Sequence, residues 1–313
     1  MPASAPRRKK AGLLPDSAPG QPDPSQVLIS SAVFRKFRQL IHQETGIWLG
    51  DTKSALLCGR LSRRLRALQM SSLDEYYDLV TLPNQHDERV SMIDAITTNE
   101  TRFFRDPQHF EFLENGVIPC WRAEAQQGLR GKSVRVWSAG CSSGEEPYSL
   151  ALLLARHLPA EQGWSVTILA TDVSTRILAQ ARVGIYNIAK APDIPESLLK
   201  DYMLKGINQQ EGQMKVMPNI QAMVDFQKLN LAHGPYPPEA HFDVIFCRNV
   251  LIYFDLLSKQ KVVEHLTRCL VHNGLLFVGQ AENLSSMNLQ LRSLVPAVYA
   301  RPGERLGYES EDF

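Results

Sequence analysis

The spacing of apolar residues changes abruptly near residue 98, and no other feature of the sequence limits the fold as strongly. From Ser31 to about Thr98, apolar residues recur every three or four positions, which predicts amphipathic helices. Beyond Thr98, short apolar runs alternate with helical segments, a pattern typical of a parallel α/β sheet. The 313 residues are enough for two domains, at roughly 100–200 residues each. We therefore expect a small all-helical domain at 28–98 and an α/β domain at 99–303.

The first domain is predicted to consist of successive helices. The first has an apolar face and ends at Gly46, a residue suited to a helix C-terminus. A second is expected at 53–69, and Ser72 and Glu75 have capping-box spacing at the start of a third. Apolar residues at 90, 93 and 96 indicate a fourth helix. The second helix also carries a basic surface, made by Arg60, Arg63, Arg64 and Arg66.

In the second domain, strands and helices are predicted to alternate, with one interruption. Strands are expected at 134–137, 166–170, 224–227, 244–247, 275–279 and 298–300, and helices at 146–157, 174–184 and 256–270. The interruption at about 192–223 contains a helix at 195–204, a turn rich in Gly, Asn and Gln, and a strand at 214–217. We interpret it as an inserted hairpin that forms a small β-subdomain.

Composition excludes several classes of protein. A net charge of +1 argues against a nucleic-acid partner, and no apolar run approaches the roughly 18 residues of a membrane span. The five cysteines are scattered along the chain, which predicts free thiols in the cytoplasm rather than disulfides or a metal site. The Pro-rich segment 1–27 is expected to be a disordered tail, and 304–313 an acidic tail.

The turn after the first predicted strand, at 138–146, indicates a ligand site. Gly140 and Gly144 allow the backbone to approach a ligand at the carboxyl end of a strand. Glu145 and Glu146 open the following helix, and their charge opposes the phosphate that a dinucleotide-binding turn receives. A cationic ligand fits this turn better. We therefore predict S-adenosylmethionine, which carries an amino group and a sulfonium.

Two acidic residues near this turn have alternative interpretations. Asp172 closes the second predicted strand, where an acidic residue suits the two hydroxyls of a ribose. Alternatively, Asp172 only caps the helix that begins near Ser174. Glu146 either contacts the ligand or only interacts with the N-terminus of its own helix. The neighbouring glycine turn favours ligand contacts for both residues.

Three long motifs, in this order, carry a family resemblance. TTNETRFFR at 97–105, WSAGCSSGEEPYS at 137–149 and FCRNVLIYF at 246–254 resemble the signatures of the CheR-type chemotaxis receptor methyltransferases. The resemblance extends from about residue 30 to 300. It implies a Rossmann-like S-adenosylmethionine-dependent methyltransferase domain with an inserted β-subdomain, preceded by a helical domain that recognises the receptor.

The resemblance also assigns roles to individual residues. It implies cofactor contacts by Asn99, Thr101, Arg105, Glu146, Asp172, Asn230, Leu231, Cys247 and Arg248. Arg105 and Tyr253 correspond to the active-site pair, although a tyrosine at a strand end can also be a packed aromatic. Receptor binding is assigned to Arg60, Arg63, Arg64 and Arg66, with a solvated helix face as the alternative. The β-subdomain either captures a receptor C-terminal peptide or is a structural hairpin only.

The implied reaction is methylation of glutamate side chains on chemoreceptor cytoplasmic domains, giving methyl esters in chemotaxis adaptation. A glutamate with a pKa of about 4.3 is ionised at neutral pH and needs no general base. Two other functions stay open: a non-catalytic adaptor that binds S-adenosylmethionine, and a methyltransferase for nucleic acid or a small molecule. The presence of both Arg105 and Tyr253 argues against the adaptor. Near-neutral charge and the lack of an Asn-Pro-Pro-Tyr type of motif argue against the nucleic-acid enzyme.

Overall fold

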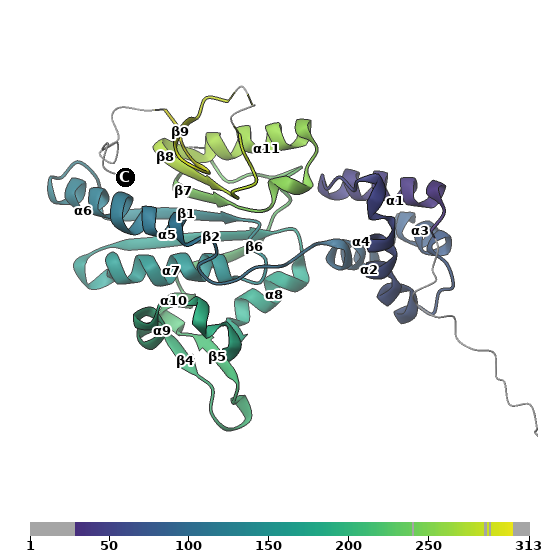
Figure 1. The fold of residues 1–313 in the computed structure, drawn as a ribbon, viewed down its shortest axis with the longest axis horizontal. Coiled ribbons are helices and arrows are strands. Elements are labelled where there is room, and N and C mark those ends of the chain that lie inside the picture. Colours follow the sequence, from purple (N-terminus) through teal and green to yellow (C-terminus); the bar gives the residue numbers. More distant parts are fainter. Residues whose placement is uncertain (1–28, 240, 285–286, 288, 303–313) are drawn as a thin grey trace, which may run out of the picture.

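The computed structural model describes residues 29–239, 241–284, 287 and 289–302. The predicted tails at 1–27 and 304–313 lie outside these residues. The described chain forms a helical domain and a larger α/β domain, joined by the segment 97–106 (Figure 1). No helix within the described ranges is long and apolar enough to cross a lipid bilayer.

The helical domain follows the predicted order of elements. It contains α1 (Ser31–Thr45), η2 (Asp51–Lys53), α2 (Ser54–Ala67), α3 (Leu73–Thr81) and α4 (His86–Ile96). The predicted end at Gly46 is confirmed, because Gly46 is left-handed and its N–H donates to the carbonyl of His42. The capping box is only half formed. Ser72 Oγ accepts from the N–H of Glu75, but the Glu75 carboxylate accepts from the N–H of Ser71.

The main sheet has the strand order β6-β2-β1-β7-β8-β10-β9. Its strands are β1 (Ser133–Ala139), β2 (Ser165–Asp172), β6 (Val224–Lys228), β7 (Phe242–Cys247), β8 (Leu270–Val278), β9 (Arg292–Val295) and β10 (Val298–Ala300). The pairs among β6, β2, β1, β7 and β8 are parallel, as predicted, and β10 is antiparallel to β8 and β9. The sequence did not predict β9, whose four residues lack an alternating pattern.

Helices cover both faces of the sheet. Along β1, Val134 and Val136 belong to the core under α7 (Glu145–His157), whereas Trp137 and Ala139 belong to the core under α11 (Leu256–Cys269). This alternation follows from the two-residue period of a strand. The first core also packs α8 (Thr175–Val183) and three elements that the sequence did not predict, α5 (Pro107–Phe112), the π-turn η3 (Leu113–Val117) and α6 (Ile118–Gln126).

The predicted β-subdomain is a separate antiparallel sheet of order β3-β5-β4 that projects from the α/β domain (Figure 1). Its strands are β3 (Ile185–Asn187), β4 (Met203–Lys205) and β5 (Gln213–Val216), with α9 (Glu196–Tyr202) between β3 and β4. The subdomain therefore begins earlier than the predicted bound of 192. The three residues of β3 follow directly on Gly184, which ends α8, and are too few to show a strand period.

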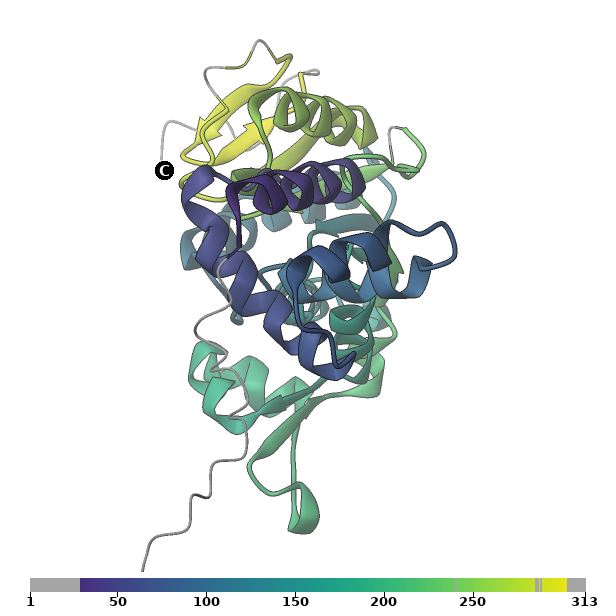
Figure 2. The ribbon, with the colours of Figure 1, turned by 90° about the vertical axis from the view of Figure 1, so that its right-hand side faces the viewer.

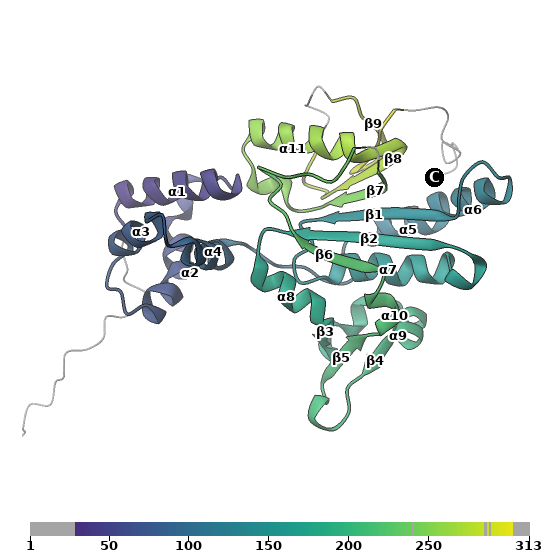
Figure 3. The ribbon, with the colours of Figure 1, turned by 180° about the vertical axis from the view of Figure 1, so that it is seen from behind.

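Parallel register places the carboxyl ends of β1, β2 and β7 at one edge of the sheet. The helical domain lies across this edge, as the view from its side and the view from behind show (Figures 2 and 3). Open α/β sheets bind ligands at this edge. The fold therefore places the helical domain over the expected ligand site.

Candidate functional site

A cavity of about 520 Å³ lies between the helical domain and the carboxyl ends of the parallel strands. Its walls are the segment 45–60 of the helical domain, the linker 96–105 and the turns that follow β1, β2, β6 and β7. The structure brings together nine of the predicted site residues in this lining, Asn99, Thr101, Arg105, Glu146, Asp172, Asn230, Leu231, Arg248 and Tyr253. Arg60 also lines it.

Cys247 does not line the cavity. It is the last residue of β7, has no exposed surface and packs in the core under α11. Burial raises the pKa of its thiol well above the ordinary value, with Glu282 and Glu146 adding to the effect. Cys247 therefore supports the cavity wall from behind, and its side chain does not reach the cavity itself.

The glycine turn after β1 is shaped by the close approach of a side chain from another turn. Gly140 has φ 85°, and a Cβ there would overlap with the side chain of Val250 in the turn after β7. Glycine tolerates this left-handed conformation without steric cost. The N–H groups of Gly140 and Cys141 both donate to the carbonyl of Thr171 in β2, at 2.8 and 2.9 Å. The turn is therefore held against the neighbouring strand before any ligand binds.

Asp172 organises two backbone segments at the cavity. One carboxylate oxygen accepts from the N–H of Ser142 in the glycine turn and the other from the N–H of Ser174, each at 2.9 Å. Burial raises the pKa of Asp172, while these backbone hydrogen bonds act in the opposite direction. The cap of α8 is Ser174, whose hydroxyl accepts from the N–H of Ile177, so Asp172 does not itself cap the helix; it binds the N–H of the cap residue and lines the cavity. Its remaining lone pairs are available to ribose hydroxyls.

Glu146 and Arg248 form a buried charged network. Glu146 accepts from the hydroxyl of Ser138 at 2.7 Å and from Arg248 Nη1 at 3.3 Å. Arg248 Nη2 also donates to the carboxylate of Asp106 and to the carbonyl of Arg105, both at 2.5 Å, and its side chain is 1% exposed. Burial raises the pKa of Glu146, with Arg248 opposing the shift.

Glu145, which the sequence grouped with Glu146, points elsewhere. Its carboxylate binds Lys190 and the hydroxyl of Ser143, at 2.5 Å for the latter, and the residue has no exposed surface. Glu145 does not line the cavity. Of the two glutamates, only Glu146 therefore presents its carboxylate to the cavity.

Left-handed backbone is concentrated around the cavity. Phe104, Asp106, Ser142 and Asn249 have φ between 47° and 58° without being glycine. Such conformations cost energy and persist where surrounding contacts hold them, often at functional sites. Asn249 lines the cavity, and its buried side-chain oxygen has no hydrogen-bond partner among the described residues. A buried acceptor of this kind suits a ligand donor.

The helical domain is attached beside the cavity through backbone carbonyls and a short strand-like contact. Asn230 Nδ2 donates to the carbonyl of Glu44 at 2.7 Å, and its oxygen accepts from the N–H of Ala232 at 2.9 Å. Trp48 N–H donates to the carbonyl of Tyr253 at 2.8 Å. Asn230 thus uses its side chain to dock α1, although the resemblance assigned it to the cofactor.

Two family matches cover most of the described chain. Residues 99–299 match "CheR methyltransferase, SAM binding domain", and residues 32–97 match "CheR methyltransferase, all-alpha domain". The chain belongs to the CheR methyltransferase family. It is an S-adenosylmethionine-dependent methyltransferase, and the resemblance carried by the three motifs is confirmed.

Curated relatives of the CheR family align over most of their own length. The chemotaxis protein methyltransferase of Escherichia coli (strain K12) is 38% identical over 277 residues, which are 88% of this chain and 92% of that protein. The protein of the same description from Salmonella typhimurium (strain LT2) is 37% identical over 276 residues, with the same coverage of both chains. Chemotaxis protein methyltransferase 2 of Pseudomonas aeruginosa is 34% identical over 267 residues, 85% of this chain and 92% of that protein.

In this CheR-family chain, the arginines predicted to bind a receptor fall into two groups. Arg60 is bound to the linker, through the carbonyl of Ile96 and the hydroxyl of Thr98, the latter at 2.7 Å. Arg64 binds the Glu88 carboxylate with both ends of its guanidinium, and its side chain is 29% exposed. Neither is free to engage a partner. Arg63 and Arg66 are exposed, and neither pairs with an acidic side chain in the described ranges.

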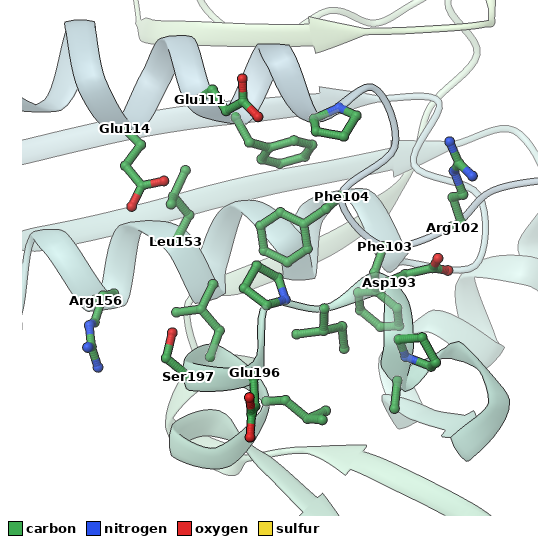
Figure 4. Close-up of a pocket in the computed structure, with 18 of the residues that line it drawn as sticks. Arg102, Phe103, Phe104, Glu111, Glu114, Leu153, Arg156, Asp193, Glu196 and Ser197 are labelled. Atoms are coloured by element: carbon green, nitrogen blue, oxygen red, sulfur yellow. The ribbon is translucent and has the colours of Figure 1, made fainter.

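A second cavity, of about 1210 Å³, lies between α5–η3, the end of α7 and the β-subdomain. Phe103 and Phe104 project into it from the linker, and Glu114 and Arg156 stand at the opposite side (Figure 4). It contains none of the predicted site residues. The linker of this CheR-family chain therefore presents Arg105 to the cofactor cavity and Phe103 and Phe104 to the other.

Proposed function

We propose that this chain transfers the methyl group of S-adenosylmethionine to glutamate side chains of chemoreceptor cytoplasmic domains, giving methyl esters in chemotaxis adaptation. One observation carries this proposal. A single cavity holds the buried carboxylate of Asp172 and the half-buried carboxylate of Glu146 at its strand side, and Arg105 and Tyr253 at its linker and β7 sides. The first pair suits a cationic nucleoside, and the second pair suits a carboxylate substrate.

The cavity fits the cofactor in its polar groups. Asp172 offers carboxylate lone pairs to ribose hydroxyls, and Glu146 offers a negative charge to the amino group. Asn249 adds a buried acceptor without a partner in the described chain. Asn99, Thr101 and Leu231 line the same space. Bound S-adenosylmethionine supplies an electrophilic methyl group on its sulfonium, so that a carboxylate oxygen forms the new C–O bond as the C–S bond breaks.

The residues of this chain then have two tasks, to orient the reacting groups and to exclude water from them. The substrate carboxylate is already ionised at neutral pH, so no side chain has to remove a proton. Holding the reacting atoms in line can contribute roughly 7–11 kcal/mol. Arg105 is half-buried and bound only to the carbonyl of Glu100, at 3.3 Å, among the described residues. Its remaining donors can hold a carboxylate while the Tyr253 hydroxyl directs the approach.

The exposed arginines of α2 provide a surface for the receptor. Arg63 and Arg66 lie on the same helix as Leu56 and Arg60, which line the cavity. Two exposed positive charges on the helix that lines the cavity suit an acidic receptor segment, and their effect is mainly on the rate of association. We assign receptor attraction to Arg63 and Arg66, and domain structure to Arg60 and Arg64.

We also propose that the β-subdomain tethers a receptor C-terminal peptide. The strand β4 lies at one edge of its sheet, and Leu204 and Ile207 beside that edge are 44% and 72% exposed. An exposed edge accepts a peptide as an added strand, with backbone hydrogen bonds for affinity and alternate side chains for specificity. Titration with C-terminal pentapeptides of the organism's own receptors tests the tether. If none binds and receptor truncation leaves methylation unchanged, the subdomain is structural only.

The reaction is tested with methyl-labelled S-adenosylmethionine and receptor cytoplasmic fragments. Label that is released by mild alkali identifies methyl esters, and we expect all receptor label to behave in this way. Alkali-stable label would indicate N-methylation and contradict the proposed substrate group. A cytoplasmic location is part of this proposal, because its substrate is the cytoplasmic part of a receptor and because free cysteine thiols, five in this chain, are stable in that compartment.

A further inference from the structure

The segment 249–253 after β7 carries the proposed active-site residue Tyr253, yet the backbone conformation of this segment depends on contacts from outside it. Asn249 is left-handed, and the following 3-10 turn η7 (Leu251–Tyr253) has no side-chain cap. The backbone N–H groups at the start of such a turn need partners from outside it. The source of those partners decides where Tyr253 lies.

Glu282, which follows β8, supplies them. One of its carboxylate oxygens accepts from the N–H of Asn249 at 2.8 Å, and the other accepts from the N–H of Ile252 at 3.0 Å. The first oxygen also accepts from the N–H of Gly279 at 2.6 Å. Glu282 has no exposed surface and no ion-pair partner in the described part of the chain. All three partners are donors, so the buried group acts as an acceptor with both oxygens.

The contacts place Tyr253 between two fixed points. The N–H of the preceding residue, Ile252, donates to Glu282. The carbonyl of Tyr253 itself accepts from the N–H of Trp48 in the helical domain. Asn249, Val250, Ile252 and Tyr253 all line the cofactor cavity. A shift of this short segment therefore moves the cavity wall and the tyrosine hydroxyl together.

We propose that Glu282 is a positioning residue for methyl transfer, which sets the place of Tyr253 through the backbone of 249–252. The proposal rests on the proposed function of Tyr253. A carboxylate suits this place because it accepts on both oxygens, whereas an amide would direct its NH₂ group at a backbone N–H. Glu282→Gln keeps the size of the side chain and removes one of the two acceptors.

The test compares Glu282→Gln with wild type in kcat, in KM for a receptor fragment and in calorimetric affinity for S-adenosylmethionine. Loss of a hydrogen bond to a buried donor costs about 1–3 kcal/mol, which corresponds to roughly a 5- to 150-fold fall in kcat if it acts on the transition state. We expect a fall in kcat in this range that exceeds any loss of cofactor affinity, to which a shift of Asn249 in the cavity wall contributes, and a KM for the receptor fragment changed by less than about threefold. Glu264→Gln on α11 is the matched control, since Glu264 is half-buried and, within the described ranges, hydrogen-bonded to Gln260 alone. It should keep the wild-type kcat.

A double-mutant cycle distinguishes positioning from general structure. If Glu282 acts through Tyr253, then Glu282→Gln lowers kcat in the wild type but has little further effect in a Tyr253→Phe background. Unchanged kcat in Glu282→Gln, or full additivity of the two losses, overturns the proposal. Glu282→Asp, which retains both oxygens on a shorter stem, should lose less than Glu282→Gln. If neither variant folds and binds cofactor, Glu282 is a folding residue and the proposal falls.

Failure of the proposed methyl transfer and failure of the Glu282 role give different results. If wild-type protein gives no alkali-labile label on receptor fragments, the proposed function is wrong. If wild-type protein gives that label and the Glu282 variants behave as in the overturning outcomes, only the positioning role is wrong.

Discussion

The helical and α/β domains enclose the same cavity, but they are fixed to it in different ways. On the α/β side, Asp172 and Arg248 lie at strand ends and Glu146 lies in the first turn of α7, and all three are held by buried hydrogen bonds and charges. The helical domain has its own apolar core, and among the described apolar residues of the α/β domain only Val173 packs against it. Its docking relies mainly on polar contacts to backbone groups.

This difference in attachment implies different roles for the two domains. An interface made of polar contacts at helix ends resembles those between domains that move relative to one another. We infer that the sheet side sets the geometry of the reaction, while the helical side supplies a wall and a charged approach. We therefore compare changes in the α/β domain with changes in the helical domain.

The largest difference is expected between the arginine–carboxylate pairs of the two domains, one buried and one partly solvated. Arg248→Met leaves the carboxylates of Glu146 and Asp106 without their cation in the α/β core, which should lower the free energy of unfolding by about 3–5 kcal/mol. Arg64→Met in the helical domain should cost only about 1 kcal/mol, because that pair is partly solvated and Glu88 keeps its hydrogen bond from Tyr76. Urea unfolding measures both. Equal losses would show that the two domains hold their charges alike.

A second large effect concerns cofactor affinity. Asp172→Ala removes the proposed ribose acceptor together with the bond to the Ser142 N–H, and should weaken S-adenosylmethionine binding by about 1.5–3 kcal/mol. Calorimetry on the folded variant measures the change. Asp225→Ala on the neighbouring strand β6 is the control, because Asp225 is exposed and outside the cavity. Unchanged affinity in Asp172→Ala would remove Asp172 from the cofactor site.

A smaller effect is expected where the domains meet through His42 of α1 and Asp255, the cap residue of α11. Their side chains are 2.6 Å apart. Burial would raise the pKa of Asp255, but hydrogen bonds from Ser258 and His42 outweigh it and lower the pKa to about 2. The folded state therefore gains stability from ionised Asp255 above its unfolded pKa of about 3.9, and loses it as pH falls toward 2.

Asp255→Asn tests this contact because it keeps a helix-capping acceptor and removes the charge. Between pH 4 and 2 its stability should depend less on pH than that of the wild type, by a few tenths to about 1 kcal/mol after solvent screening. Acid titrations of both proteins, followed by circular dichroism, measure the difference. Identical acid profiles would mean that the ionic contact does not hold the helical domain.

The smallest effect is expected at the exposed arginines of α2. Reversing both charges, in Arg63→Glu with Arg66→Glu, should slow receptor methylation by about three- to tenfold at low salt, because charges at a rim act on association. Added salt should slow the wild type and have less effect on the variant. Arg122→Glu with Arg176→Glu makes the same charge change at exposed positions of the α/β domain and serves as the control. Salt-independent kinetics in all proteins would indicate a solvated face.

The sequence predicted the long elements well and the short ones poorly. Helices α1 to α4, the parallel strands and α11 have periods that extend over enough residues to be recognised. The elements α5, η3 and α6 follow the left-handed Asp106, and β3 and β9 are too short to show a period. Their places are decided by packing on the first core and by pairing with distant strands.

The functional site was likewise predicted only in part from the sequence. The motifs indicated Asp172, Glu146 and Arg248 as neighbours, because the carboxyl ends of parallel strands meet at one edge of a sheet. No spacing showed that Glu145 turns toward Lys190, that Arg60 and Arg64 are bound within the protein, or that Cys247 lies behind the wall. Asn249 stands inside a motif that the sequence singled out, yet its left-handed backbone and unpartnered oxygen appear only in the fold.

The sequence by itself determined the two-domain order, the parallel sheet and the family, since these depend on local periodicity and on contiguous motifs. The tertiary structure alone decided which charged side chains are free and which are bound, because their partners lie far along the chain. Glu282 is the clearest case: it is 33 residues from Asn249 and 30 from Ile252. Folding of β8 beside β7 brings its carboxylate to their N–H groups.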